Sequence, residues 1–95
     1  MSARGNAIGT TIENTDRVTI TEWRFAPGAE TGWHRHNLDY VVVYRTAAQL
    51  SVETRDGVAS THVIEGTSYF RRAGVEHNII NSGSGEVIFL EVELK

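Results

Sequence analysis

The sequence has no cysteine and only one proline among its 95 residues. Without cysteine the chain has no disulfide, no thiolate ligand for a metal and no thiol nucleophile. It also lacks an apolar run long enough to cross a membrane, and its first six residues lack the apolar segment of a secretory signal. We therefore expect a cytoplasmic protein.

Positive charge is also scarce. Nine lysines and arginines stand against twelve acidic residues, which gives a formal net charge of −3. Such a chain has no basic stripe to neutralise phosphates, so nucleic acid is not an expected partner. Anionic lipid headgroups should repel it, so a membrane is not expected either. A small-molecule ligand or substrate is the partner left to consider.

No segment shows the apolar spacing of a capped helix, whereas valine, isoleucine, threonine and aromatic residues make up 35 of the 95 residues. Short strands separated by glycine turns are expected at residues 17–25, 40–44, 50–54, 61–64, 68–71, 77–80 and 87–94. Residues 1–9 are interpreted as a flexible lead-in. The continuous apolar run at residues 40–44 predicts a strand buried on both faces. One all-β domain over residues 1–95, a sandwich or barrel, follows from this pattern.

Four histidines are the candidates for chemistry. His34 and His36 are two residues apart, so in a strand their imidazoles point to the same side. Such a pair is half of a transition-metal site, and His77, just after a predicted turn, is the best third ligand. The alternative is a pair of surface histidines. His62 has no motif partner and is expected to be an exposed strand residue.

The spacing around these histidines resembles the two sequence motifs of the cupin family. Gly28 precedes His34 by five intervening residues, and one residue separates His34 from His36. The second motif has Gly66, then Gly74, then His77 and Asn81. This resemblance implies a jelly-roll β-barrel that holds a divalent transition metal (Fe, Mn, Ni, Co or Zn) on His34, His36 and His77.

The sequence departs from the cupin pattern where the family usually has a glutamate ligand. Tyr40 and Val41 stand at those positions, so the expected ligand set is neutral. Strand parity directs Tyr40, the catalytic candidate, to the same side as His36, where it would be a fourth ligand, a hydrogen-bond donor behind the ligands or a cavity wall. The alternative is a core aromatic residue whose hydroxyl binds water. Arg72 and Trp33 are the substrate-binding candidates, with a solvated arginine and a core or interface tryptophan as the alternatives.

A closer resemblance, carried by residues 22–36, 39–43, 68–71, 73–78 and 91–95, is to small cupins of the BauB type, which are labelled β-alanine degradation proteins. Two functions follow as hypotheses. The first is a metal-dependent enzyme, dioxygenase-like or isomerase/lyase-like, acting on a small carboxylate. The second is a non-catalytic small-ligand-binding cupin with a structural or vestigial metal site. We also expect a homodimer that pairs through edge strands, because that would cover exposed backbone and enlarge a small core.

Overall fold

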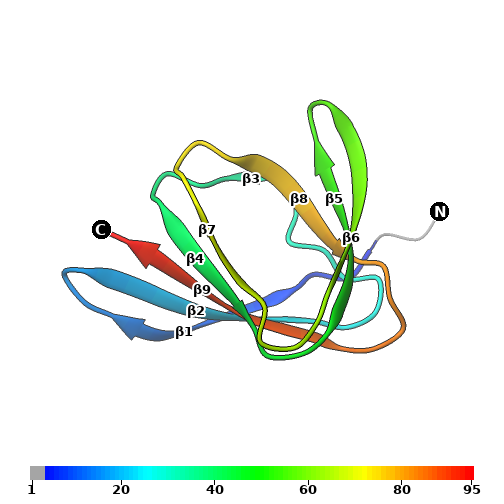
Figure 1. The fold of residues 1–95 in the computed structure, drawn as a ribbon, viewed down its shortest axis with the longest axis horizontal. Coiled ribbons are helices and arrows are strands. Elements are labelled where there is room, and N and C mark those ends of the chain that lie inside the picture. Colours follow the sequence, from blue (N-terminus) through cyan, green and yellow to red (C-terminus); the bar gives the residue numbers. More distant parts are fainter. Residues whose placement is uncertain (1–3) are drawn as a thin grey trace.

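Two antiparallel sheets that curve toward each other make up the fold (Figure 1). The computed structural model describes residues 4–95. Within that range the strands are β1 (Ile8–Asn14), β2 (Val18–Phe25), β3 (His34–Arg35), β4 (Tyr40–Tyr44), β5 (Ala48–Thr54), β6 (Gly57–Val63), β7 (Ser68–Arg71), β8 (Glu76–Asn81) and β9 (Val87–Leu94). The all-β prediction is confirmed. Among these residues no helix is long and apolar enough to span a membrane.

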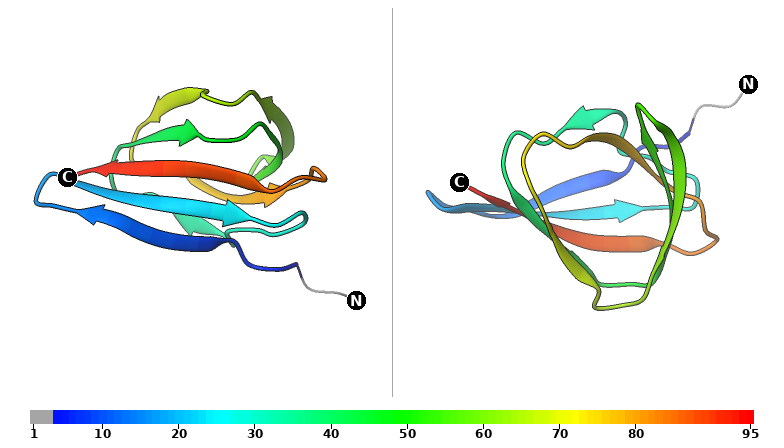
Figure 2. Two further views of the ribbon diagram at one scale, coloured as in Figure 1. Left: turned by 90° about the horizontal axis from the view of Figure 1, so that it is seen from below. Right: turned by 45° about the horizontal axis from the view of Figure 1, so that its top comes forward.

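The strand order interleaves distant parts of the chain. One sheet runs β1-β2-β9-β4-β7 and the other runs β3-β8-β5-β6. Figure 2 shows the strands of the first sheet side by side, with β9 between β2 and β4. Because β9 pairs with both β2 and β4, the last strand of the chain lies at the centre of the larger sheet.

The core lies between the two sheets and follows the period of two in the strands. On β4, Tyr40, Val42 and Tyr44 are buried, and on β9, Val87 and Phe89 meet them from the neighbouring strand. This alternation settles which face of each strand points inward. It also corrects the prediction for residues 40–44, because one face of β4 is buried here and the other is only half-buried.

The N-terminal segment differs from the sequence-based expectation. Where a flexible lead-in was predicted through residue 9, Ile8 and Gly9 pair with β2, and the Ala7 amide donates to the Glu30 carbonyl oxygen at 2.8 Å. Residues 1–3 of that prediction lie outside the described residues. Strand β1 itself was not predicted. Its side chains are all exposed, so no buried apolar face marks it in the sequence.

Candidate metal centre

Two short segments bring the three histidines together. His34 on β3 and His77 on β8 are direct cross-strand partners, so their side chains lie on the same face of the sheet. His36 follows two residues after His34, and its amide donates to the Val75 carbonyl oxygen at 2.9 Å. The Gly74 amide donates back to the His36 carbonyl oxygen at 2.8 Å. Gly74 has a φ of 104°, a conformation that strains other residues, so this turn requires glycine.

The three imidazoles point their Nε2 atoms at a common point. The distance between the Nε2 atoms of His34 and His36 is 3.0 Å, and that between His36 and His77 is 3.2 Å. Metal–nitrogen bonds of about 2.1 Å place two ligand atoms of one ion roughly 3.0 to 3.4 Å apart, for octahedral and tetrahedral angles respectively. The cluster therefore fits a transition-metal ion as its ligand set.

The other ring nitrogens set the tautomers that a metal requires. His34 Nδ1 lies 2.9 Å from the Gly32 carbonyl oxygen, which only accepts, so Nδ1 carries the proton and Nε2 keeps its lone pair. Burial, and the neighbouring imidazoles, lower the pKa of His36 and of His77 to about 4. Both rings are therefore neutral at physiological pH, the form in which histidine binds metals.

A carboxylate that the motif analysis missed lies behind His36. The Oε1 atom of Glu91 is 3.3 Å from His36 Nδ1, and its Oε2 accepts a hydrogen bond of 3.1 Å from the Trp23 indole. Glu91 is 9% exposed, and burial raises its pKa, which the Trp23 hydrogen bond opposes. The glutamate ligand that is usual in the cupin motif is absent from β4. Strand β9 instead supplies a glutamate that orients a histidine ligand from outside the cluster.

Alternation along β9 was the available signal for this residue. Glu91 is two residues after Phe89 and four after Val87, both of which are buried. It therefore had to face inward with them. What the sequence did not indicate is that β9 lies at the centre of its sheet, beside the strand that carries Tyr40.

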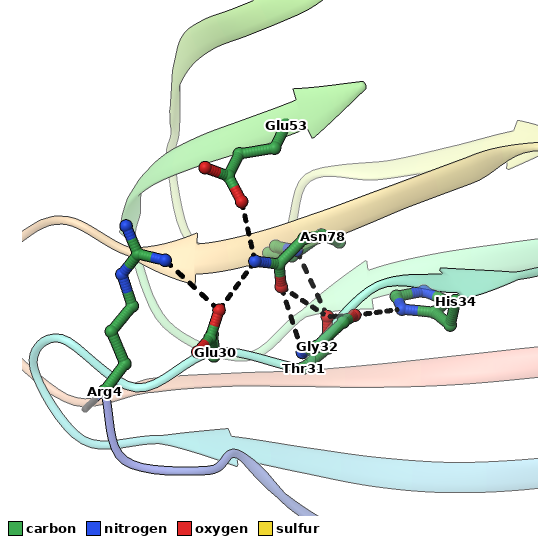
Figure 3. A network of polar contacts seen from close by, with 8 residues as sticks. Arg4, Glu30, Thr31, Gly32, His34, Glu53 and Asn78 are labelled. Atoms are coloured by element: carbon green, nitrogen blue, oxygen red, sulfur yellow. Dashed lines mark hydrogen bonds and ion pairs between the residues drawn. The ribbon is translucent and has the colours of Figure 1, made fainter. Parts of the chain in front are cut away.

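A second polar network supports the loop that leads to His34 (Figure 3). The Asn78 side-chain oxygen accepts from the Gly32 amide at 2.9 Å, and its amide nitrogen donates to Glu30 at 2.6 Å and to Glu53 at 2.8 Å. Asn78 directly follows His77 and is 6% exposed. One buried amide thus ties the residue whose carbonyl orients His34 to the strand that carries His77.

The histidine cluster forms part of the wall of a cavity of about 240 Å³. Its lining combines aromatic and aliphatic surface with a few polar groups, which is typical of small-ligand sites. The residues around it are Trp23, Thr31, His34, Arg35, His36, Tyr40, Val42, Tyr69, His77, Ile79, Phe89, Glu91 and Glu93. A ligand in this cavity would meet the three histidines and the two carboxylates of Glu91 and Glu93, with Arg35 at its border.

Tyr40 lies at the cluster, whereas the two predicted substrate-binding residues do not. The Tyr40 ring stacks on the His36 ring with 3.9 Å between centroids, and burial raises its pKa to about 12. Trp33 is 50% exposed and does not line the cavity. Arg72 is also exposed and away from it, because it lies beyond the end of β7. The arginine and tryptophan that do line the cavity are Arg35 and Trp23.

The remaining polar candidates have structural contacts. His62 is exposed on β6, as expected. Asp39 does not line the cavity, and its carboxylate accepts from the Ala73 amide at 2.8 Å, which holds the turn before β8. Glu76 is paired at the surface with Arg55 at 2.8 Å and with Arg35 at 3.5 Å. The second contact holds the Arg35 guanidinium beside Glu76, which does not line the cavity.

An antiparallel double-sheet barrel with histidines on its inner wall is what the cupin resemblance implied, and the comparison with known families agrees. The profile described as "Cupin domain" matches residues 21–93, so the chain belongs to the cupin family. Its histidine cluster is accordingly a possible cupin metal site.

The chain is also similar to individual proteins of known sequence or structure. The chain is 52% identical over 95 residues to the β-alanine degradation protein BauB of Pseudomonas aeruginosa PAO1, covering 100% of both chains. A crystal structure of a cupin domain from Bordetella pertussis Tohama I is 48% identical with a TM-score of 0.97, covering 100% of this chain and 99% of that one. A Klebsiella pneumoniae protein with a double-stranded β-helix domain, 22% identical with a TM-score of 0.79, shares the fold over 99% of this chain and 81% of its own.

Proposed function

We propose that this protein is a cytoplasmic, metal-dependent cupin enzyme that acts on a small carboxylate or a related metabolite. The observation that carries the proposal is the convergence of three Nε2 atoms on one point in the wall of a cavity. A divalent ion bound there would supply Lewis acidity, and iron would add the capacity for chemistry with O₂. The reaction class we propose is dioxygenase-like or isomerase/lyase-like.

The cavity supports a small anionic substrate. Its volume of about 240 Å³ is below the roughly 300 to 1,000 Å³ of pockets for drug-sized ligands. Arg35 borders it, and because its guanidinium is 61% exposed and held only by a 3.5 Å surface pair with Glu76, a substrate carboxylate would compete with Glu76 for it. The name of the Pseudomonas relative refers to β-alanine degradation, which makes β-alanine and other small carboxylates the first compounds to test.

The residues around the cluster have distinct roles in this proposal. Glu91 fixes the His36 ring, with Trp23 holding the carboxylate in turn. Tyr40 keeps its proton at neutral pH because its pKa is about 12, so it would donate a hydrogen bond rather than act as a base. The Glu93 carboxylate lines the same cavity and is the candidate base.

The alternative is a non-catalytic cupin that binds a small ligand and uses the metal structurally. One observation favours it: Tyr40, which stacks on the His36 ring, has a pKa raised to about 12 and is removed as a base, which leaves Glu93 as the candidate. The two functions differ in turnover. A binding protein would hold a carboxylate without converting it, whereas an enzyme would consume it.

Metal content and turnover test the proposal together. Elemental mass spectrometry on untagged protein should find about one equivalent of metal per chain, and the His34→Ala/His77→Ala variant should lose it. His62→Ala is the matched control because His62 is exposed and outside the cluster. β-Alanine, other small carboxylates and diketones would then be screened with and without O₂ for consumption.

The outcomes separate the two functions. Consumption that disappears in the double variant supports the enzyme. Ligand binding by calorimetry without consumption, in metal-loaded protein, supports the binding cupin. Absence of bound metal even after incubation with Fe, Mn, Ni and Zn would overturn both metal-based functions.

A further inference from the structure

A second cavity lies between the two sheets, beside the metal cavity. Its volume is also about 240 Å³, and both sheets contribute to its lining. Four residues border both cavities: Tyr40, Tyr69, His77 and Ile79. Because His77 belongs to the histidine cluster, the second cavity is adjacent to the candidate metal centre. We call this second cavity the side chamber.

The two cavities differ in the charge of their lining. Glu91 and Glu93 line the metal cavity, with Arg35 at its border. Within residues 4–95, the lining of the side chamber contains no carboxylate, and its one permanently charged residue is Arg71. The acids of the metal cavity would repel the carboxylate of a ligand, whereas Arg71 would attract it. The side chamber is therefore the better place for the anionic end of a ligand.

Strand geometry directs Arg71 toward the inside of the fold. Strand β7 runs beside β4, where Arg71 pairs with Tyr40, so the two side chains lie on the same face of the sheet (Figure 1). Tyr40 is buried on that face and stacks on the His36 ring. Arg71 is thus one strand away from a residue that contacts the cluster. Arg72, the candidate chosen from the sequence, lies beyond the end of β7 and lines neither cavity.

The Arg71 guanidinium is positioned by its neighbours but has no acidic partner. It lies 4.1 Å from the centroid of the Tyr69 ring, and its Nη1 donates to the Phe70 carbonyl oxygen at 3.0 Å. Among residues 4–95 no carboxylate pairs with it, and its Nε and Nη2 have no acceptor. These two nitrogens form one edge of the planar group, which matches the two oxygens of a carboxylate.

The ring beneath this guanidinium is itself held in place. The Tyr69 hydroxyl lies 2.9 Å from the Tyr44 hydroxyl, and Tyr44 is 2% exposed. Leu50, Val52 and Ala59 line the same chamber and give it apolar walls. Arg71 is therefore oriented before a ligand arrives, and the space between it and the cluster suits a short hydrocarbon segment.

We propose that the side chamber binds the distal carboxylate of the substrate through Arg71, while the opposite end of the same molecule reaches the metal on the three histidines. This inference rests on the proposed function and names its substrate class. The substrate would have a carboxylate at one end, a carbonyl or second carboxylate at the other, and a short apolar segment between them. Arg71 is a binding residue in this arrangement, and Arg35 stays with Glu76.

Binding of matched acids to Zn²⁺-loaded protein tests this inference by isothermal titration calorimetry. Glutarate has two carboxylates and butyrate has one, so wild type should bind glutarate more tightly. Arg71→Gln should raise the dissociation constant for glutarate by about 10- to 100-fold, because a bidentate charged hydrogen bond is lost. The preference for glutarate over butyrate should disappear with it.

Arg72→Gln is the matched control, since Arg72 is exposed, adjacent in the chain and outside both cavities. It should bind glutarate like wild type. Metal content and circular dichroism show whether Arg71→Gln keeps the fold and the metal centre. With both intact, the loss of affinity belongs to the side chamber.

Several results would overturn the inference. They are equal glutarate affinities in Arg71→Gln and wild type, an equal loss in Arg72→Gln, and a Zn²⁺-loaded wild type that binds neither acid or prefers neither. A loss in Arg35→Gln alone would place the carboxylate at the border of the metal cavity instead. In each of these cases metal content and turnover of other carboxylates still support the proposed function, whereas a protein that takes up no metal contradicts both.

Discussion

Glu91 is the residue that links the sheet centre to the histidine cluster. Its carboxylate contacts His36 Nδ1 and leaves Nε2 of that ring free to face the other two histidines. A carboxylate in this position fixes the ring and raises its basicity. Glu91→Gln should therefore weaken metal binding by about 10- to 100-fold, measured by titration against a competing chelator.

The charge-matched control for this prediction is Glu93→Gln. Glu93 lies on the same face of β9 and lines the same cavity, and its charge acts on His36 through space. If Glu91 acts by fixing the His36 ring, the Glu93→Gln variant should bind metal more tightly than the Glu91→Gln variant. Equal affinities in the two variants would show that Glu91 acts only as a charge.

Asn78 has a comparable role on the loop side of the cluster. Asn78→Ala would leave the Gly32 amide without its acceptor, and it would leave Glu30 and Glu53 without the shared donor. We expect the free energy of unfolding to fall by about 2 kcal/mol, measured by urea denaturation, because buried polar groups lose their partners. Asn37→Ala, at an exposed position of the next loop, should change it little.

The sequence identified the ligand residues better than the residues that line the cavity around them. His34, His36 and His77 were recognisable because their spacing is local and their register follows from two short strands. Arg72 was chosen for its nearness to His77 in the chain, but the turn after β7 carries it away from the cavity. Arg35 borders the cavity even though alternation on β3 places its side chain on the face opposite His34, beside Glu76.

At the scale of elements, several strands followed from local patterns, although β6 begins at Gly57 rather than at the predicted residue 61, and the strand order did not follow from them. The predicted strands at residues 40–44, 68–71 and 87–94 match β4, β7 and β9. β5 and β6 also pair across Asp56-Gly57, a dipeptide that is typical of tight hairpin turns. The position of β9 between β2 and β4 depends on contacts between residues some fifty to seventy positions apart, about which alternation within a strand says nothing.

Strand β1 and the two-residue β3 are missing from the predicted strands, and the contact of β1 with Trp23 explains the place of β1. A Cβ added at Gly9 would lie 2.8 Å from the Trp23 ring, so β1 rests directly on the indole whose nitrogen donates to Glu91. Gly9→Ala should displace this ring or the strand. We expect a loss of about 1 to 2 kcal/mol in the free energy of unfolding.

Tryptophan fluorescence reports whether the ring moves. In a Trp33→Phe background, Trp23 is the remaining tryptophan, and Gly9→Ala should shift its emission. Gly5→Ala is the control, because a Cβ at Gly5 would meet nothing within 4 Å. An unchanged spectrum and stability in Gly9→Ala would mean that β1 is not held against the indole.

At the scale of the whole molecule, the barrel keeps two histidines neutral in its interior, which couples folding to pH. Metal-free protein should lose stability as the pH falls from 7 to 5. His36 and His77 have a pKa of about 4 when folded and about 6.5 when unfolded, so between these values the unfolded chain binds more protons. The stability that the neutral rings contribute is complete above pH 6.5 and is lost progressively toward pH 4.

The buried Glu91 should have the opposite effect on the pH dependence of folding stability. Burial raises the pKa of Glu91, so the folded state takes up that proton more readily than the unfolded chain, and this offsets part of the loss at low pH. Melting temperatures of chelator-treated protein at pH 7, 6 and 5 should therefore fall more steeply for Glu91→Gln than for wild type. His36→Gln/His77→Gln should flatten the dependence, whereas His62→Gln, at an exposed position, should not. A wild-type melting temperature that is constant from pH 7 to 5, with the double variant unchanged beside it, would contradict the coupling of these two histidines to folding.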